Sequence, residues 1–432
     1  MTDNIISRAM LKKSIDDWHH WYCRAREKLY PRYHGFEIPK KNALALIGVR
    51  RAGKTYTAIS LSLKYPLERV LYFNFEDPSI HMNNSVLNLD EIISVYTEYN
   101  GREPLLILWD EIHNIDGWEK WVRKIVDTEK YRLILTGSSA NFLSSELSSS
   151  ITGRSIEKKI WPCSFLEFLN FKKKQTTNTL SAHEYLAALR EYLKWGGFPE
   201  VLLTTSQTQK KDLLKQYLQD AITKDVVTRH EVRIKRHLDQ IVTYYLTNIS
   251  SLHSYNSLKR AFGINVETVS EYTHYLNEAF LVFEVPRYHQ NLKVQVRDPK
   301  KIYAIDTGLR NTNAVSIHED SGKLAENIVF VELLRRNLHE VTYFKGKGEV
   351  DFVLTQNYIP RHAIQVCFSN LESPNLFKRE VDSLVECLNE LKLSAGAILT
   401  LNRQETIKVE KKKISLMPLY LWLLEQKLNY TQ

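Results

Sequence analysis

The eight residues from Gly48 to Thr55 constrain this chain more than any other segment, because they read GVRRAGKT and match the pattern G-x-x-x-x-G-K-[ST]. They directly follow the apolar run ALALIGV and directly precede YTAISLSLK, whose apolar spacing is helical. Glycines let successive backbone N–H groups curve around phosphates at a helix N-terminus, which carries partial positive charge. We therefore predict a phosphate-binding loop between a buried strand and a helix.

The side chains of this loop have distinct expected roles. Lys54 is expected to reach the β and γ phosphates of a nucleotide, and Thr55 is expected to ligate Mg²⁺. The cofactors that follow from this pattern are ATP and Mg²⁺. The residues expected to surround the nucleotide are Gly48, Arg50, Arg51, Ala52, Gly53, Lys54, Thr55 and Tyr56.

A second pattern further along the chain is typical of a Walker B strand. The apolar run LLILW at positions 105–109 ends in Asp110 and Glu111. Asp110 is expected to hold Mg²⁺ through water, and Glu111 to orient and polarise the attacking water. Two acids after an apolar strand are often only a solvated strand end. Downstream of the phosphate-binding loop, with one strand run between, they favour a catalytic role.

Four further residues are weaker candidates for the same site. The next strand run, RLIL, ends in TGSS, and Ser138 is expected to sense the γ phosphate from a strand between those of the loop and of Asp110. Arg154 follows a serine-rich loop and is a candidate arginine finger; the alternative is an ordinary surface arginine. Glu76 and Asp77 close another strand run, where helix capping or a salt bridge explains them as well as contact with Mg²⁺ does.

The pattern of strands and helices predicts several domains, since 432 residues exceed one compact core. Residues 1–35 read as a helical leader whose aromatic side chains pack against a neighbouring domain. Residues 36–162 alternate strands and helices, which predicts a parallel sheet. Residues 163–235 are helical, 236–315 have the order of a winged helix, and 316–432 form a separate α/β unit.

Composition limits the classes of function. The net charge of +9 and pI of about 9.1 favour attraction to nucleic acid, although a basic chain without such a partner fits equally well. The four cysteines are widely spaced and form no zinc pattern, which favours a reduced, cytoplasmic protein. No apolar run reaches the roughly 20 residues that span a bilayer, and the N-terminus lacks the apolar region of a signal peptide. No membrane association is expected.

Together these segments resemble a bacterial and archaeal family of AAA-type ATPases that carry a C-terminal domain of unknown function. The resemblance covers about residues 40 to 400, and its loop and Walker B parts are the most specific. It implies an α/β fold with an additional-strand P-loop core, then a winged helix and a terminal unit similar to the PD-(D/E)XK fold of restriction endonucleases. The segments that carry it are GVRRAGKT, LILWDEIHNIDGWEKWV, LTGSSANFLSSEL, TGR, WPCSFLEFL, WGGFPEV and GEVDFVL.

The winged-helix segment suggests DNA binding, but its second helix is acidic. Residues 266–278 include Glu267, Glu271 and Glu278 and no lysine or arginine, whereas groove binding needs cations against phosphate. Lys259 and Arg260, on the preceding helix, could still contact a DNA backbone. A protein partner or an intramolecular role is the favoured hypothesis.

The terminal unit suggests a nuclease, but its pattern is incomplete. Glu326 and Asp351 occupy expected acidic positions, whereas Gln365-Val366-Cys367 stands where Glu-x-Lys is expected. Cys367 cannot supply the lysine charge that polarises water. An inactive scaffold is therefore favoured. Two lysines on the turn before Asp351 could substitute from another direction, Lys345 and Lys347.

These observations leave three hypotheses for function. The leading one is Mg²⁺-dependent ATP hydrolysis by residues 40–162, with the nucleotide state communicated to the C-terminal domains. The rival is an ATP-gated switch with slow turnover that grips DNA or a protein partner. The third is an ATP-regulated nuclease. A homo-oligomer would be needed if Arg154 serves a neighbouring subunit.

Overall fold

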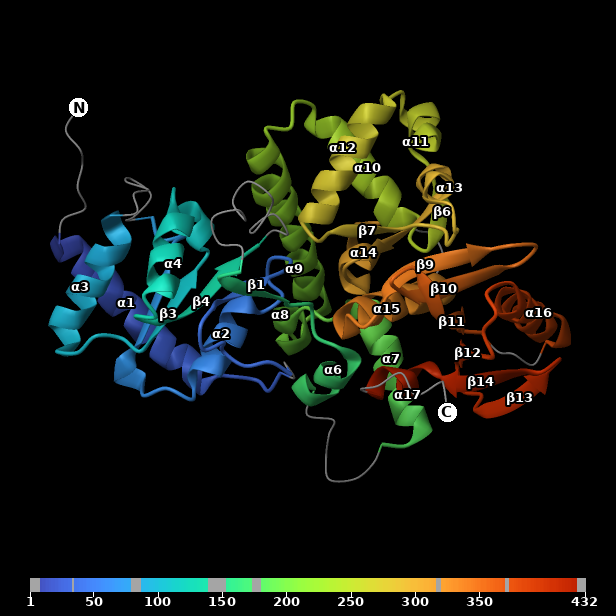
Figure 1. Cartoon of the computed structure of the whole chain (residues 1–432), viewed down its shortest axis with the longest axis horizontal. Helices are drawn as coiled ribbons and strands as arrows, with labels where there is room; N and C mark the ends of the chain where they lie inside the picture. Colours follow the sequence, from blue (N-terminus) through green and yellow to red (C-terminus); the bar gives the residue numbers. More distant parts are fainter. Residues whose placement is uncertain are drawn as a thin grey trace. The chain divides into compact units, whose positions relative to one another are not determined.

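The computed structural model describes residues 8–32, 35–78, 87–138, 153–172, 180–315, 320–369 and 373–425. The chain divides into two compact units, residues 1–161 and 162–432 (Figure 1). Within the described residues, no helix is both long and apolar enough to cross a membrane.

The first unit is built on a five-stranded parallel sheet with the order β2-β3-β4-β1-β5. The apolar runs of β1 and β3 are buried at every position, as expected for a parallel sheet covered on both faces. β4 lies between β1 and β3, so the predicted strand between them is confirmed. The strands are β1 (Ala43–Ile47), β2 (Val70–Asn74), β3 (Leu106–Asp110), β4 (Arg132–Gly137) and β5 (Ser155–Lys159).

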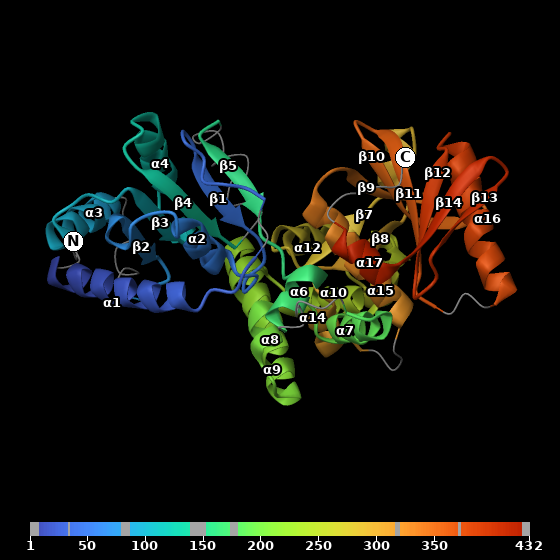
Figure 2. The same cartoon turned by 90° about the horizontal axis from the view of Figure 1, so that it is seen from below.

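Helices cover this sheet, and the predicted helical leader is one of them. α1 packs along the edge strand β2 (Figure 2). The rings of Trp18, Trp21 and Tyr22 contact the ring of Tyr72, with centroids 5.1 to 5.9 Å away. The leader aromatics therefore pack against the sheet of their own unit, whereas the sequence predicted packing against a neighbouring domain. The helices are α1 (Arg8–Glu27), α2 (Lys54–Ser62), η1 (Leu67–Arg69), α3 (Leu87–Asn100), η2 (Ile112–Asn114) and α4 (Trp118–Asp127).

The second unit begins with helices, as the periodicity of residues 163–235 predicts. Ser164 and Ser181 are the N-caps of α6 and α7. Each forms a capping box, which satisfies N–H groups of the first turn. The chain then turns at Gly196 and Gly197, where the carboxylate of Asp306 accepts a hydrogen bond from the Gly197 N–H at 2.6 Å. The elements are α6 (Phe165–Phe171), α7 (Ala182–Trp195), α8 (Pro199–Leu203), α9 (Gln207–Asp220) and the π-helical η4 (Ala221–Thr228).

A three-stranded antiparallel sheet follows, with the order β6-β8-β7. Asn265 caps the helix α12, whose bounds match the segment predicted from the sequence. In chain order the elements are α10 (Lys235–Thr247), β6 (Ser251–His253), α11 (Tyr255–Phe262), α12 (Val266–Glu278), β7 (Val282–Val285), α13 (Leu292–Arg297), β8 (Lys300–Ala304) and α14 (Thr307–Asn313).

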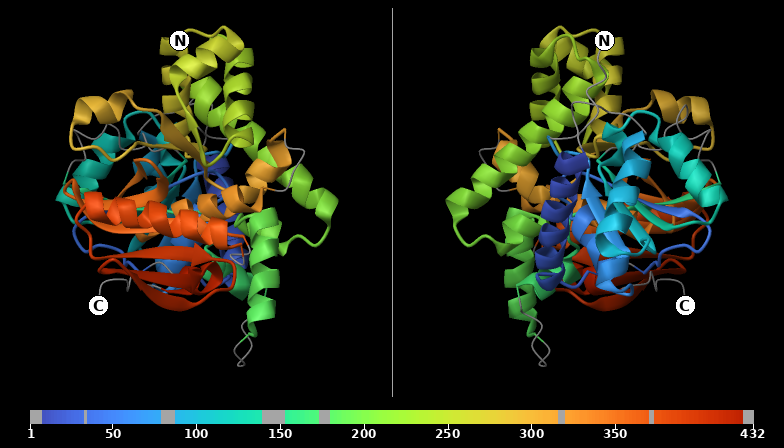
Figure 3. Two further views of the ribbon diagram at one scale, coloured as in Figure 1. Left: turned by 90° about the vertical axis from the view of Figure 1, so that its right-hand side faces the viewer. Right: turned by 90° about the vertical axis from the view of Figure 1, so that its left-hand side faces the viewer.

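The C-terminal part is a mixed six-stranded sheet with the order β13-β14-β12-β11-β10-β9. α16 packs across β10, β11 and β12, and Figure 3 shows this helix along the sheet. The elements are α15 (Ser321–Arg336), β9 (Glu340–Lys345), β10 (Glu349–Gln356), β11 (Ile359–Cys367), α16 (Pro374–Glu390), β12 (Ala395–Thr400), β13 (Glu405–Val409), β14 (Lys412–Pro418) and α17 (Leu419–Leu424).

Candidate functional site

The predicted phosphate-binding loop connects the end of β1 to the start of α2, and its glycines are required by its geometry. Gly48 has φ of 144°, and a Cβ there would lie 2.2 Å from the carbonyl oxygen of Ile160. Gly53, the N-cap of α2, has φ of 97°. Both values are strained for residues with side chains. Arg32 braces the loop by donating to the carbonyls of Ala52 and Trp161, at 2.6 and 2.8 Å.

Lys54 is held inside this loop. Its side chain is buried, and its ammonium donates to the carbonyls of Gly48 and Val49 at 3.0 and 3.3 Å. The same ammonium lies 3.9 Å from Oε1 of Glu111. A buried cation at a helix N-terminus is suited to a phosphate group, for which it can exchange the neutral carbonyls.

Asp110, at the end of β3, accepts hydrogen bonds from three hydroxyl groups. Thr55 donates at 2.9 Å, Tyr72 at 2.9 Å and Thr136 at 2.5 Å. Burial, with Glu111 beside it, raises the pKa of Asp110 to about 6. A cation here would favour the charged carboxylate. The Thr55 hydroxyl and the Asp110 carboxylate are adjacent oxygen ligands of the kind Mg²⁺ prefers, so these residues fit the ion.

Glu111 adopts an unusual backbone conformation directly after Asp110. Its φ is 54° and its ψ is 43°, in the left-handed region that is rare for residues other than glycine. Such strain persists only where surrounding contacts hold it, and it clusters at functional sites. The Glu111 N–H donates to Thr136 Oγ1 at 3.0 Å, and its Oε2 lies 3.4 Å from Nδ1 of His113. The carboxylate therefore lies between the ammonium of Lys54 and the ring of His113.

The sequence did not indicate two residues of this site, Thr136 and Tyr72. The predicted residue Ser138 lies beside the site. Thr136 joins Asp110 to the Glu111 backbone, and it stands in the same TGSS segment from which Ser138 was chosen. Tyr72 reaches Asp110 from β2, and no sequence motif marks it. Ser138 is fully buried just after Gly137, which pairs with Ile47 at the end of β1.

The finger role predicted for Arg154 is wrong for the nucleotide site of its own chain. Its carbonyl accepts from the Ala43 N–H at 2.8 Å, so it lies where β1 begins, whereas the loop follows the end of β1. Four residue steps along a strand separate these edges by about 13 Å. The guanidinium instead donates to Asp127 at 2.6 Å. This salt bridge is the alternative role that the sequence left open.

The remaining candidate residues make salt bridges, hydrogen bonds or ring contacts with other side chains of the first unit. Arg50 forms a salt bridge with Glu76 at 2.9 Å, and Trp18 Nε1 donates to Asp77 at 2.8 Å. These contacts support the structural interpretation of the two acids. Tyr56 is exposed, and its ring centroid lies 6.3 Å from that of Trp21.

We expect Thr136→Val to destabilise the protein by about 1 to 3 kcal/mol, because the buried N–H of Glu111 loses its acceptor. ATP hydrolysis should also slow, since Asp110 and Glu111 each lose a hydrogen bond to Thr136. Urea unfolding and phosphate release measure the two effects. Thr97→Val is the matched control, because the hydroxyl of Thr97 is buried without a hydrogen-bond partner. Equal stability of the two variants would remove Thr136 from the site.

A second cluster of charged side chains lies in the C-terminal part, and it contains a lysine that the sequence did not indicate. Lys301, on β8, is buried and its ammonium contacts three carboxylates: Asp351 at 2.8 Å, Glu349 at 2.9 Å and Glu326 at 3.0 Å. Tyr303 donates to the same Glu326 oxygen at 2.7 Å. The predicted acids are therefore brought together, with a protein cation between them.

The other nuclease positions are also occupied by internal contacts. Gln365 accepts from the Asp351 N–H at 3.1 Å and donates to Glu380 at 2.6 Å. Cys367 Sγ lies 3.4 Å from the hydroxyl of Ser369. Lys345, a proposed substitute for the missing lysine, contacts Glu349 at 3.3 Å. Among the described residues, no group of three or more histidine, cysteine or acidic side chains could hold a metal ion.

Two family models match the chain: residues 40–169 match an AAA domain, and residues 186–320 match a domain of unknown function (DUF8612). The uncharacterized protein MJ1544 of Methanocaldococcus jannaschii is 33% identical over 405 residues, which cover 90% of this chain and 89% of that protein. An uncharacterized protein of Haemophilus influenzae is 28% identical over 316 residues, covering 71% and 78%. AMPPCP-bound DnaA from Aquifex aeolicus is 17% identical, with a TM-score of 0.25, and the match covers 62% of this chain and 88% of that one.

Proposed function

We propose, since the chain belongs to the family of the uncharacterized protein MJ1544 and carries an AAA domain, that its first unit binds ATP with Mg²⁺ and hydrolyses it. One observation carries this proposal. The hydroxyl of Thr55, the carboxylate of Asp110 and the ammonium of Lys54 meet beside Glu111, at the end of the phosphate-binding loop. These groups are those that phosphoryl transfer to water requires.

Each side chain then has one task. Lys54 exchanges the carbonyls of Gly48 and Val49 for phosphate oxygens, which brings its charge to the transferred group. Thr55 and Asp110 would hold Mg²⁺, which supplies charge stabilisation to the phosphate oxygens. Glu111 accepts the proton of the attacking water. Its strained backbone keeps the carboxylate beside Lys54, and Ser138 is our candidate for contact with the γ phosphate.

We further propose that residues 236–315 form a winged-helix domain that contacts a protein rather than DNA. The order helix, strand, helix, helix, strand, strand, with the short helix α13 inserted between the last two strands, supports this assignment. On α12, Glu271 accepts from the Tyr275 hydroxyl at 2.7 Å, and Glu278 lies 2.9 Å from His274 and 3.3 Å from His230. This acidic helix opposes the approach of DNA phosphates.

The hydrolysis rate with and without duplex DNA, single-stranded DNA and RNA tests the choice of partner. A rate that none of the three changes is expected if the partner is a protein. Stimulation by duplex DNA that falls steeply with salt would overturn the protein assignment. ATP bound without turnover in every arm would favour the rival hypothesis of a binding switch.

We propose that the terminal unit keeps a nuclease-like arrangement without the activity. Lys301 stands among Glu326, Glu349 and Asp351, and its charge opposes the entry of a divalent cation. The salt bridges of Lys301 thus link β8 to β10 and α15. Incubation of duplex DNA with Mg²⁺ or Mn²⁺ should give no cleavage above background. Cleavage that disappears in Asp351→Ala would overturn this proposal.

Lys301→Met should lower the free energy of unfolding by about 3 to 5 kcal/mol, because it leaves buried carboxylates without their cation. Urea unfolding of the full chain measures this loss. Lys293→Met, at an exposed position of the same segment, is the matched control and should change stability little. A Lys301→Met protein as stable as this control would show that the cluster contributes nothing.

A further inference from the structure

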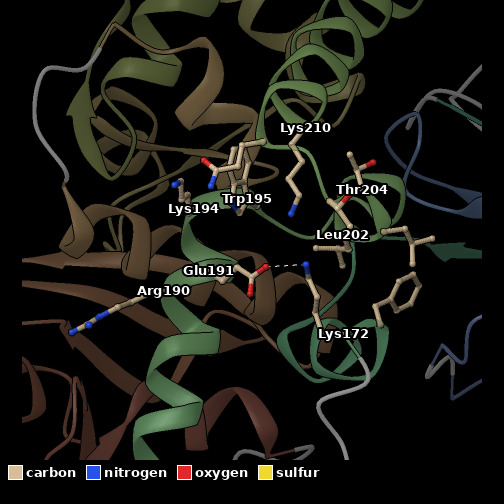
Figure 4. A pocket seen from close by; sticks show the side chains of 12 residues that line it. Lys172, Arg190, Glu191, Lys194, Trp195, Leu202, Thr204 and Lys210 are labelled. Carbon is tan, nitrogen blue, oxygen red and sulfur yellow. Dashed lines mark ion pairs between the residues drawn. The ribbon is translucent and has the colours of Figure 1, made fainter.

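A pocket of about 680 Å³ lies in the second unit, between α7, α8 and the start of α9 (Figure 4). Its volume is in the range of small-molecule sites. Phe171, Trp195 and Leu202 give it apolar walls, while Thr204 and Thr205 add hydroxyl groups. Four cationic side chains and one carboxylate complete the lining: Lys172, Arg190, Lys194, Lys210 and Glu191.

Lys210 is the unusual member of this lining. Its side chain is only 4% exposed, and Figure 4 shows its ammonium pointing into the pocket. The ammonium lies 5.2 Å from the centroid of the Trp195 ring, and no described carboxylate lies within salt-bridge distance of it. A charged group buried without a partner of opposite charge costs several kcal/mol. The pocket therefore holds a buried cation that makes no salt bridge with a carboxylate of the described residues.

The charges around Lys210 are mostly positive. Burial lowers the pKa of Lys210 and the ammonium of Lys172 lowers it further, whereas the carboxylate of Glu191 raises it. Lys172 and Lys210 point toward one another from opposite sides of the pocket (Figure 4). The carboxylate of Glu191 is 2.8 Å from Lys172, and Lys194 adds a third ammonium 5.1 Å from the Trp195 ring centroid. The pocket lining thus contains one carboxylate and four cationic side chains.

The helix α9 adds a second attraction for anions. It begins at Gln207 after the N-cap Ser206, and Gln207 lines the pocket with the two preceding threonines. The N–H groups of a first helical turn lack intrahelical acceptors and carry partial positive charge. The Ser206 hydroxyl accepts from the Gln209 N–H at 3.4 Å, and the helix start together with Lys172 and Lys210 forms an arrangement suited to phosphate.

We propose that this pocket binds a small organic anion through its phosphate group, with Lys210 and Lys172 on either side of that group. The phosphate supplies the negative charge that the buried Lys210 lacks. The apolar wall formed by Phe171 and Leu202 leaves room for the organic part of the ligand. This site lies within the second unit, and it is separate from the proposed nucleotide site of the first unit.

Titration of the full chain with inorganic phosphate tests this proposal, with binding measured by calorimetry and the melting temperature followed in parallel. Lys210→Met removes the charge and keeps the apolar stem, whereas Lys211→Met removes the charge of an exposed neighbour on the same helix. Because the two variants are otherwise identical, their difference isolates the pocket from any phosphate bound by the first unit. Further arms with AMP and glucose 6-phosphate distinguish a nucleoside from a sugar as the organic part.

We expect Lys210→Met to weaken phosphate binding at this site at least about tenfold, the scale of one charge-assisted hydrogen bond, while Lys211→Met binds as the wild type does. Without phosphate, Lys210→Met should melt at or above the wild-type temperature, since it removes an unpaired buried charge. Phosphate should then raise the melting temperature of Lys211→Met more than that of Lys210→Met. Equal phosphate binding by both variants would overturn the proposal. A lower melting temperature of Lys210→Met without phosphate would also overturn it, because it would make Lys210 a structural residue.

Discussion

Lys54→Ala should weaken ATP binding at least about 100-fold, because it removes at least two charge-assisted hydrogen bonds of about 1.5 to 3 kcal/mol each. The ammonium of Lys54 is the cation that the loop holds at the start of α2. Calorimetric titration with a non-hydrolysable ATP analogue measures the loss. Lys64→Ala, at an exposed position soon after α2, is the matched control and should bind as the wild type does. Unchanged affinity in Lys54→Ala would refute the assignment of the phosphate-binding loop.

Glu111→Gln should keep ATP bound and lower the hydrolysis rate at least about 100-fold. The amide can still hydrogen-bond a water molecule, but it cannot take up the proton that general base catalysis removes, which contributes roughly 10² to 10⁴ in rate. Single-turnover hydrolysis with a parallel binding titration separates the two effects. Glu119→Gln, a buried glutamate on α4, controls for the loss of a buried charge. A wild-type rate in Glu111→Gln would assign proton removal to another residue.

The sequence predicts most of the first unit because its signals are local. An apolar run, a glycine-rich turn and a helical spacing lie next to one another around Gly48, and backbone geometry alone explains the two loop glycines. Asp110 and Glu111 are likewise predicted from a local signal, because they stand at the end of a buried apolar strand. Parallel strands bring such strand ends to one edge of the sheet, so residues distant in sequence meet there.

Arg154 lies away from the nucleotide site of its own chain, and the reason is geometric. The residue directly precedes the strand run SIEKK, so it lies where β5 begins. In a parallel sheet, the starts of the strands lie opposite the edge where the loop after β1 is found. The serine-rich loop before Arg154 suggested a role at the site, but the place of Arg154 at the start of a strand is the stronger signal.

Contacts between distant segments account for the residues that the sequence missed. Lys301 pairs with Glu326 and Asp351, which follow it by 25 and 50 residues, and nothing in its own segment marks it as more than a strand residue. Tyr72 is similar, because its hydroxyl meets Asp110 only when β2 and β3 pair. The hairpin of β13 and β14 was not predicted, since its short strands are rich in lysine and lack a long apolar run.

Release of phosphate from ATP by the purified full chain, with and without Mg²⁺, tests Mg²⁺-dependent hydrolysis at this site most directly. We predict release that requires Mg²⁺ and that is lost in Lys54→Ala and Glu111→Gln proteins prepared in the same way. Release at the wild-type rate in both variants, or none from wild-type protein saturated with Mg²⁺ and ATP, would contradict it.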